Sequence, residues 1–177
     1  RRVLFRSVLA ALMLVMLSLD ANAIPLFNRQ TGQNCVACHA GGQFPELTPA
    51  MRAACARLID AGIPLLSQTV LLKGINDEIE TLAQLMRAFV EERIKPYYLH
   101  HADLAPGTSH FRASIREGIN LMRTLRAMMP GTPLPNYVLD LPGGFSKVNL
   151  ESANAVEGQP GHWRLQDEAG RWHDYPE

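Results

Sequence analysis

The sequence has no excess of charge of either sign. Its 177 residues include 17 basic and 17 acidic side chains, which gives a formal net charge of zero. Without a basic surplus the chain has no general attraction for the phosphates of nucleic acids or acidic lipids, and we expect no nucleic-acid partner. The composition is globular, with 47% hydrophobic and 19% charged residues, and the length suffices for one domain with a buried core.

Cysteine is scarce as well, with three residues in the whole sequence, too few for a disulfide framework. Cys35 and Cys38 form a Cys-x-x-Cys motif that His39 follows directly. Cys55 lies between alanines in a helical pattern, which predicts a buried and inert thiol.

The main apolar run, VLAALMLVMLSL at residues 8–19, is too short to span a bilayer comfortably. Residues 21–23, ANA, add the small-x-small pattern of a cleavage site. The sequence therefore predicts a secretory signal helix within residues 1–23, with a membrane anchor as the alternative and no stable anchor after cleavage. The first seven residues, RRVLFRS, include no initiator methionine and resemble one reading frame of a widely used sequencing adapter.

The motif at residues 35–39 has the spacing of a covalent haem site. Two thioethers can clamp the porphyrin while the adjacent imidazole reaches the iron, so Cys35 and Cys38 would carry haem c and His39 would bind its iron. Haem attachment takes place in an oxidising, exported compartment, which agrees with the predicted signal peptide. A zinc half-site and a redox Cys-x-x-Cys pair are the alternatives.

Residues 24–49, IPLFNRQTGQNCVACHAGGQFPELTP, resemble the start of exported c-type cytochromes. They cannot bury a porphyrin alone, because chains below about 40 residues rarely form a core. No sixth iron ligand is assigned, since the nearest candidate, Met51, lies in the next segment.

The region from residue 50 onward follows a different pattern, in which helical and strand-like segments alternate. Apolar residues at helical spacing predict amphipathic helices, and short apolar, β-rich runs predict strands. The predicted helices are residues 50–61, 78–92 and 114–129, the predicted strands are residues 63–72, 94–101 and 136–141, and a small hairpin turns at residues 168–170.

This alternation predicts an α/β fold with parallel strands joined by short crossovers. In such sheets ligands gather at the carboxyl ends of the strands. Polar side chains occur there in this sequence, namely Gln68, His100, His101, Asp103, Asp140 and Lys147.

Three stretches of this region, AGIPLLSQTVLLKGIND, KPYYLHHADLAPGTSHFR and YVLDLPGGFSKV, resemble the carboxyl-terminal half of the lysine 2,3-aminomutase family. The family consists of radical S-adenosylmethionine enzymes that also carry pyridoxal phosphate. The resemblance implies a partial (β/α) barrel of the radical type, while the polar, irregular sequence after residue 148 predicts a carboxyl-terminal tail or hairpin. The resemblance also implies an isomerase that moves an amino group between adjacent carbons of lysine or a related amino acid.

The resemblance implies roles for four residues. Lys147 matches the family lysine that bonds to pyridoxal phosphate. Asp103 and Asp140 match the two carboxylates that hold the distant ammonium of the substrate, and Gln68 matches a position near S-adenosylmethionine. The structural alternatives are a surface lysine and two aspartates that cap loops.

The sequence departs from the family pattern just before Lys147. The family loop is mostly glycine, whereas this chain has Gly143, Gly144, Phe145 and Ser146, and the bulky Phe145 is expected to restrict the backbone. Three histidines have no family role and are expected to be satisfied or exposed, namely His100, His101 and His110.

The sequence also lacks the Cys-x3-Cys-x2-Cys triplet that holds a [4Fe–4S] cluster in radical enzymes. The resemblance therefore implies the cluster and S-adenosylmethionine, but the cluster ligands are absent. We expect a truncated aminomutase-like domain, inactive alone, whose partner is a small amino acid. Whether the chain is an enzyme, and whether it forms a homo-oligomer, stay open.

The two parts of the chain imply different compartments, since haem attachment points to the periplasm and the aminomutase part to the cytoplasm. Both the c-type cytochromes and the aminomutases have a segment like ELTP, which is residues 46–49 in this chain, where the two parts join. We expect a composite chain with an adapter-like start and signal peptide (1–23), a cytochrome fragment (24–49) and an aminomutase-like domain (50–177). The alternatives are an exported electron-transfer protein with one haem and a remnant that binds nothing.

Overall fold

The structure is a computed structural model that describes residues 47–177. The predicted signal peptide and the predicted haem ligands Cys35, Cys38 and His39 lie outside the described residues. Among residues 47–177, no helix is both long and apolar enough to cross a membrane.

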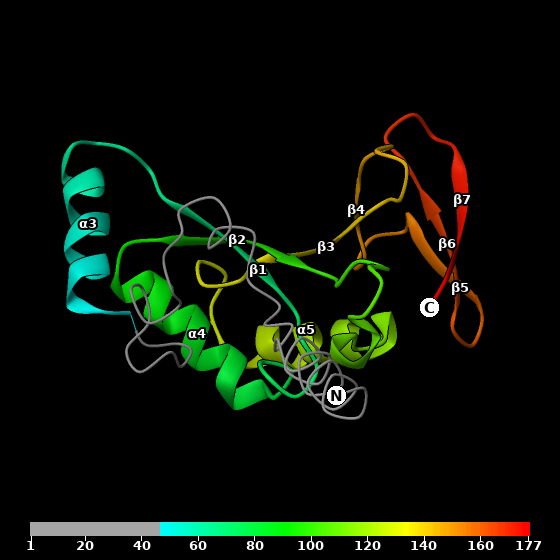
Figure 1. Cartoon of the computed structure of the whole chain (residues 1–177), viewed down its shortest axis with the longest axis horizontal. Coiled ribbons are helices and arrows are strands. Elements are labelled where there is room, and N and C mark those ends of the chain that lie inside the picture. The colour runs from blue at the N-terminus through cyan, green and yellow to red at the C-terminus, as the bar shows by residue number, and fades with distance from the viewer. Residues whose placement is uncertain (1–46) are drawn as a thin grey trace, which may run out of the picture.

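A four-stranded sheet occupies the centre of the described region (Figure 1). The first three strands run parallel and β4 pairs with β3 antiparallel. The fold is thus mixed α/β: the parallel prediction is confirmed for β1 to β3, while β4 is an antiparallel strand that the sequence does not predict. In spatial order the strands are β1 (Leu66–Val70), β2 (Lys95–His100), β3 (Asn136–Asp140) and β4 (Lys147–Asn149).

Two helices connect the parallel strands and cover the same face of the sheet (Figure 1). Helix α4 (Ile79–Glu91) joins β1 to β2, and α5 (Ile115–Met128) joins β2 to β3 after a short 3₁₀ helix, η3 (Ser109–Phe111). Helix α5 begins with a capping box, in which the Glu117 amide donates to the Ser114 hydroxyl and the Ser114 amide donates to the Glu117 carboxylate.

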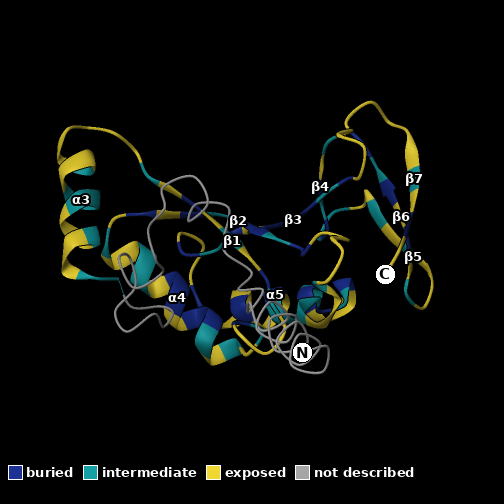
Figure 2. Ribbon diagram, viewed as in Figure 1, coloured by how far each residue is buried: buried dark blue, intermediate teal, exposed yellow. Residues whose placement is uncertain are grey.

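The core lies between this sheet face and the two helices (Figure 2). Leu82 and Met86 of α4, Leu99 of β2, Met122 of α5 and Tyr137 of β3 are each at most 1% exposed. The apolar spacing that predicts the helices therefore points into the core, as expected for amphipathic helices on a sheet.

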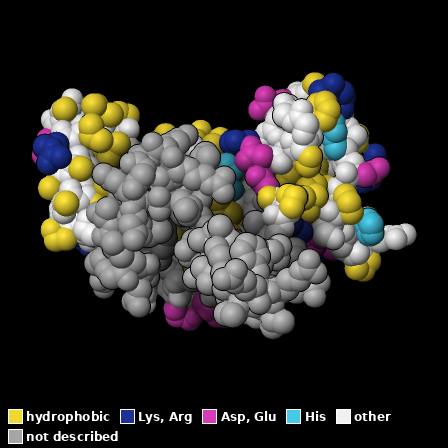
Figure 3. All heavy atoms as spheres, viewed as in Figure 1, with side chains coloured by type: hydrophobic (Ala, Val, Ile, Leu, Met, Phe, Trp, Pro, Cys, Tyr) yellow, Lys and Arg dark blue, Asp and Glu magenta, His cyan; other side chains and the backbone are white. Residues whose placement is uncertain are grey.

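Helix α3 (Pro49–Asp60) precedes the sheet and begins where the sequence predicts. The Thr48 hydroxyl accepts a hydrogen bond from the Met51 amide at 3.3 Å, and Pro49 occupies the first turn. No residue of α3 is buried, and Figure 3 shows hydrophobic side chains on its surface. The prediction of a buried Cys55 is wrong, because α3 does not enter the core and leaves this side chain half-buried.

A second, antiparallel sheet follows the first and consists of β5 (Ala155–Gln159), β6 (His162–Gln166) and β7 (Trp172–Pro176). The predicted hairpin is the β6–β7 pair, which turns between residues 166 and 172. The inner side chains of this sheet join the main core, namely Trp163, Leu165 and Tyr175.

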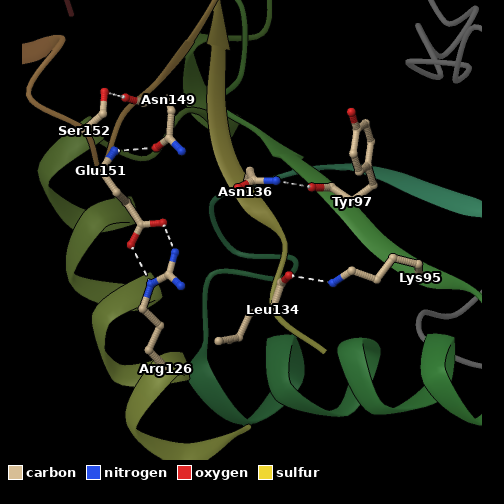
Figure 4. Close-up of polar contacts among 8 residues, drawn as sticks. All are labelled: Lys95, Tyr97, Arg126, Leu134, Asn136, Asn149, Glu151 and Ser152. Carbon is tan, nitrogen blue, oxygen red and sulfur yellow. Dashed lines mark hydrogen bonds and ion pairs between the residues drawn. The ribbon is translucent and has the colours of Figure 1, made fainter. Parts of the chain in front are cut away.

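Polar contacts fasten the sheet at the amino ends of its parallel strands (Figure 4). The Lys95 ammonium, at the start of β2, donates to the Leu134 carbonyl just before β3 at 3.1 Å. The Arg126 guanidinium of α5 forms two hydrogen bonds, of 3.0 and 2.6 Å, with the Glu151 carboxylate beyond β4. These contacts lie at the opposite edge of the sheet from the polar residues described next, which lie at the carboxyl ends of the parallel strands.

Candidate functional site

Four polar side chains, one from each strand, form a continuous row across the central sheet. The His100 Nε2 lies 3.2 Å from the Gln68 Oε1, and the His100 Nδ1 lies 2.9 Å from the Asp140 Oδ2. The Lys147 ammonium donates to the Asp140 Oδ1 at 2.5 Å. Asp140 and Lys147 are direct cross-strand partners of β3 and β4, so their side chains lie on the same face.

The row is least exposed at His100 and more exposed at both ends, where Gln68 and Lys147 lie. The His100 side chain is 13% exposed, whereas those of Asp140 and Lys147 are 41% and 40% exposed. Burial on its own would raise the pKa of the Asp140 carboxyl, but hydrogen bonds from Lys147 and His100 lower this pKa below its ordinary value. Asp140 is therefore an anion at neutral pH and attracts the Lys147 ammonium.

A cleft of about 340 Å³ adjoins the row at the ends of β2 and β3. Asp103 and Asp140, the two predicted substrate carboxylates, both line it. Two carboxylates in one concave site favour a cationic group over an anionic one. The remaining lining residues are Leu104, Ala105, Leu141, Pro142 and Tyr175.

Tyr175 is a lining residue that sequence reasoning missed. It comes from β7, and its side chain is nearly fully buried, with a hydroxyl that has no hydrogen-bond partner among the described residues. Burial raises the pKa of the Tyr175 hydroxyl to about 12, so the group is neutral. The periodicity of the sequence predicts strands and helices, but it does not predict that a residue of the β6–β7 hairpin lies beside the ends of β2 and β3. The position of Tyr175 could therefore not be predicted from it.

The three histidines have different surroundings. His101 is buried and its Nδ1 lies 2.9 Å from the Tyr137 hydroxyl. Burial, together with the nearby Arg112 guanidinium, lowers the pKa of His101 to about 4, so this ring is neutral. His110 is exposed in η3. His100, by contrast, lies inside the polar row, among the polar residues that the sequence predicts at the strand ends, and both of its ring nitrogens have a partner.

The loop between β3 and Lys147 is held by the second sheet. Gly143 and Gly144 have φ values of 90° and 74°, a region that favours glycine. The Phe145 ring lies over the His173 ring, with a centroid distance of 4.5 Å. The Arg171 guanidinium lies 5.2 Å from the same Phe145 ring. Lys147 itself is the first residue of β4, so it lies in a paired strand rather than in the glycine loop.

The described residues do not fit an iron–sulfur cluster. Across residues 47–177, no group of three or more histidine, cysteine or acidic side chains is arranged to hold a metal ion. Because the sequence also has no Cys-x3-Cys-x2-Cys triplet, we assign no cluster ligand.

Comparison with known proteins gives several related sequences, although no protein-family model matches the chain. The L-lysine 2,3-aminomutase of Bacillus subtilis is 36% identical over 132 residues, which are 75% of this chain and 28% of that protein. The putative L-lysine 2,3-aminomutase of Aquifex aeolicus is 45% identical over 105 residues, 59% of this chain and 28% of that protein. The carboxyl-terminal region of this chain belongs to the lysine 2,3-aminomutase family.

The aminomutase family also includes relatives with another named substrate. The glutamate 2,3-aminomutase of Clostridioides difficile is 36% identical over 105 residues, which are 59% of this chain and 25% of that protein. The chain spans about a quarter of the length of these curated aminomutases. The substrates named for these relatives, lysine and glutamate, differ in side-chain charge.

Proposed function

We propose that residues 50–177 form the carboxyl-terminal part of an aminomutase of this family, with the βα units of a partial (β/α) barrel. The proposed activity of the complete enzyme is the movement of an amino group between adjacent carbons of lysine or a related amino acid. The observation that carries this proposal is that Asp140 contacts Lys147 and also lines one cleft with Asp103, at the carboxyl ends of the parallel strands. The similarity to named aminomutases supports it.

Lys147 is the residue that would hold pyridoxal phosphate. The Lys147 side chain is 40% exposed, and it follows directly on a loop that contains two glycines with positive φ. These features fit an amine that must reach an aldehyde. When bound, pyridoxal phosphate would supply an aldehyde that reacts with amines and a conjugated ring that acts as an electron sink. Asp140 holds the Lys147 amine in place until then.

Asp103 and Asp140 would bind the side-chain ammonium of the substrate. An ammonium that leaves water needs both charge compensation and hydrogen-bond acceptors, and two carboxylates that line one cleft supply both. This pair favours lysine over glutamate, whose side-chain carboxylate would be repelled. Gln68, on the outer strand β1, is the residue we would place near S-adenosylmethionine. No radical step is assigned to these residues, because the cluster ligands are missing.

The substrate assignment is tested by equilibrium binding to the whole chain. L-lysine should bind more tightly than L-norleucine, which lacks the ammonium, and than L-glutamate. Asp103→Asn and Asp140→Asn should each weaken lysine binding by about 10- to 100-fold, the worth of a hydrogen bond to a charged group. Asp174→Asn, an exposed aspartate on β7, is the matched control. Equal binding of lysine and norleucine, or tighter binding of glutamate, contradicts the assignment.

The residues before the described region support a different candidate function. The Cys35–His39 motif favours a covalent haem c and hence an exported electron-transfer protein. Expression with export to an oxidising compartment tests this candidate, because attached haem gives an intense Soret band that survives denaturation. A chain that carries no haem after export excludes it.

We further propose the division at residues 1–23, 24–49 and 50–177, with a composite origin at the ELTP segment. The conflicting compartments of the two parts support this origin, since export serves haem attachment and a reducing cytoplasm serves an aminomutase. Sequencing of many independent molecules across residues 46–51 tests it. If long reads consistently cross this segment, the chain is a genuine fusion and not an assembly artefact.

A further inference from the structure

His100 is one of the two inner members of the polar row, and its side chain is less exposed than that of its neighbour Asp140. Its strand, β2, is paired on both sides, with β1 and with β3. Its ring meets the Tyr98 ring edge-on at a centroid distance of 5.6 Å, and both ring nitrogens have a polar partner. A ring held by two strands, an aromatic neighbour and two hydrogen bonds has little freedom to rotate.

The Asp140–Lys147 pair, by contrast, is half exposed on both sides. Exposed ion pairs are weak, because two side chains must give up rotamer freedom for a Coulomb attraction that water screens. A second partner on the other carboxylate oxygen reduces this cost, since it fixes the carboxylate before the lysine arrives. His100 is that partner, through the Asp140 Oδ2 at 2.9 Å.

The hydrogen bonds of the row also have a defined direction. A carboxylate only accepts, so the His100 Nδ1 must donate to Asp140. The His100 Nε2, on the other side of the ring, lies 3.2 Å from the Gln68 amide, so both ring nitrogens have a polar partner and the orientation of the ring is fixed. The row then runs from Gln68 through His100 to Asp140, where it meets the donor from Lys147.

We propose that His100 is a positioning residue, which holds one oxygen of the Asp140 carboxylate so that the other oxygen faces the Lys147 amine. Its meaning for catalysis rests on the proposed function, in which Lys147 bonds to pyridoxal phosphate and Asp140 binds the substrate. Once the Lys147 amine is engaged elsewhere, the same fixed oxygen of Asp140 is free for the ammonium of the substrate. The contact between His100 and Asp140 does not depend on that function.

Trace acetylation of the whole chain tests this role without any cofactor. A limiting amount of acetic anhydride at neutral pH acetylates each lysine according to the availability of its free amine, and peptide mass spectrometry reads Lys147, Lys73 and Lys95 separately. His100→Phe removes both ring nitrogens and should raise the Lys147 rate by about two- to fivefold, the range set by a half-exposed ion pair. The rates of Lys73 and Lys95 should not change.

Three further variants sharpen the comparison. His100→Asn keeps an N–H donor for Asp140 and should hold the Lys147 rate near the wild-type value. His110→Phe makes the same substitution at an exposed histidine outside the row and should change nothing. His100→Ala, which adds no bulk, replaces the phenylalanine variant if that protein does not fold. An unchanged or lower Lys147 rate in the folded variant overturns the proposal, and so does an equal rise at all three lysines.

A parallel measurement separates this role from the proposed function. The same samples are treated with pyridoxal phosphate and borohydride, and the position of the reduced label is read. A wild-type chain without label at Lys147 contradicts the proposed function, and the acetylation rates alone then judge His100. Label at Lys147 together with an unchanged acetylation rate in His100→Phe supports the proposed function and overturns the positioning role.

Discussion

The Phe145 ring lies over the His173 ring, with the two centroids 4.5 Å apart. This contact joins the loop before Lys147 to the last strand of the second sheet. The bulky residue that interrupts the glycine-rich loop therefore has a partner, which comes from a part of the chain that follows the loop by more than twenty residues. Phe145 thus links the loop between β3 and β4 to strand β7 of the second sheet.

Removal of this contact should loosen the loop. Phe145→Gly should raise hydrogen–deuterium exchange of the amides at residues 143–147 and lower the free energy of unfolding by about 1 kcal/mol, the worth of an aromatic pair. Phe145→Tyr keeps the ring and serves as the matched control. An exchange rate in Phe145→Gly equal to that of the wild type would show that the loop is held by other contacts.

Asp167 should give the second sheet a pH dependence. Its carboxylate accepts hydrogen bonds from His173, from the backbone and side chain of Arg171, and from the Ala169 amide, and these contacts lower its pKa from 3.8 to about 2. Because the pKa is lower in the folded chain than in the unfolded chain, this stabilisation is fully present above pH 4 and disappears as the pH falls toward 2.

The pH dependence of unfolding checks this prediction. Asp167→Asn should be less stable than the wild type at neutral pH, and the difference between the two proteins should shrink below pH 4 and vanish near pH 2. Asp174→Asn, on the same hairpin, should show no such convergence. A difference that stays constant down to pH 2 would show that the loss comes from packing rather than from the charge of Asp167.

Gly118 should tolerate no side chain. A Cβ at this position of α5 would overlap the buried Tyr137 ring. Gly118→Ala should therefore lower the free energy of unfolding by about 1–3 kcal/mol, as overpacking of a core does. Gly131→Ala is the control, because no atom lies within 4 Å of its added Cβ. Denaturant titration of both variants gives the comparison, and an equal cost for the two substitutions would be inconsistent with the contact.

The sequence was most informative where its signal was periodic and local. The apolar spacing of α4 and α5 and the short runs of β1 to β3 predict the parallel part of the sheet, and the strand ends predict that Asp103 and Asp140 share a cleft. Strand β4 was missed because a three-residue strand carries no period, and its pairing depends on β3.

The contacts of His100 could not be predicted for another reason. Its two partners, Gln68 and Asp140, are 32 and 40 residues away in the sequence, and no local pattern links a histidine to residues so distant. Tyr175 was missed in the same way, since only the packing of the second sheet against the first brings it to the cleft. Long-range contacts of this kind require the fold.

The most direct measurement is the position at which pyridoxal phosphate bonds to the chain. The whole protein is incubated with pyridoxal phosphate, reduced with borohydride and digested, and the labelled peptide is identified by mass spectrometry. The aminomutase assignment predicts label at Lys147, none at Lys73 or Lys95, and loss of the label in Lys147→Ala but not in Lys73→Ala. Label spread equally over the three lysines, or absent from Lys147, would contradict it.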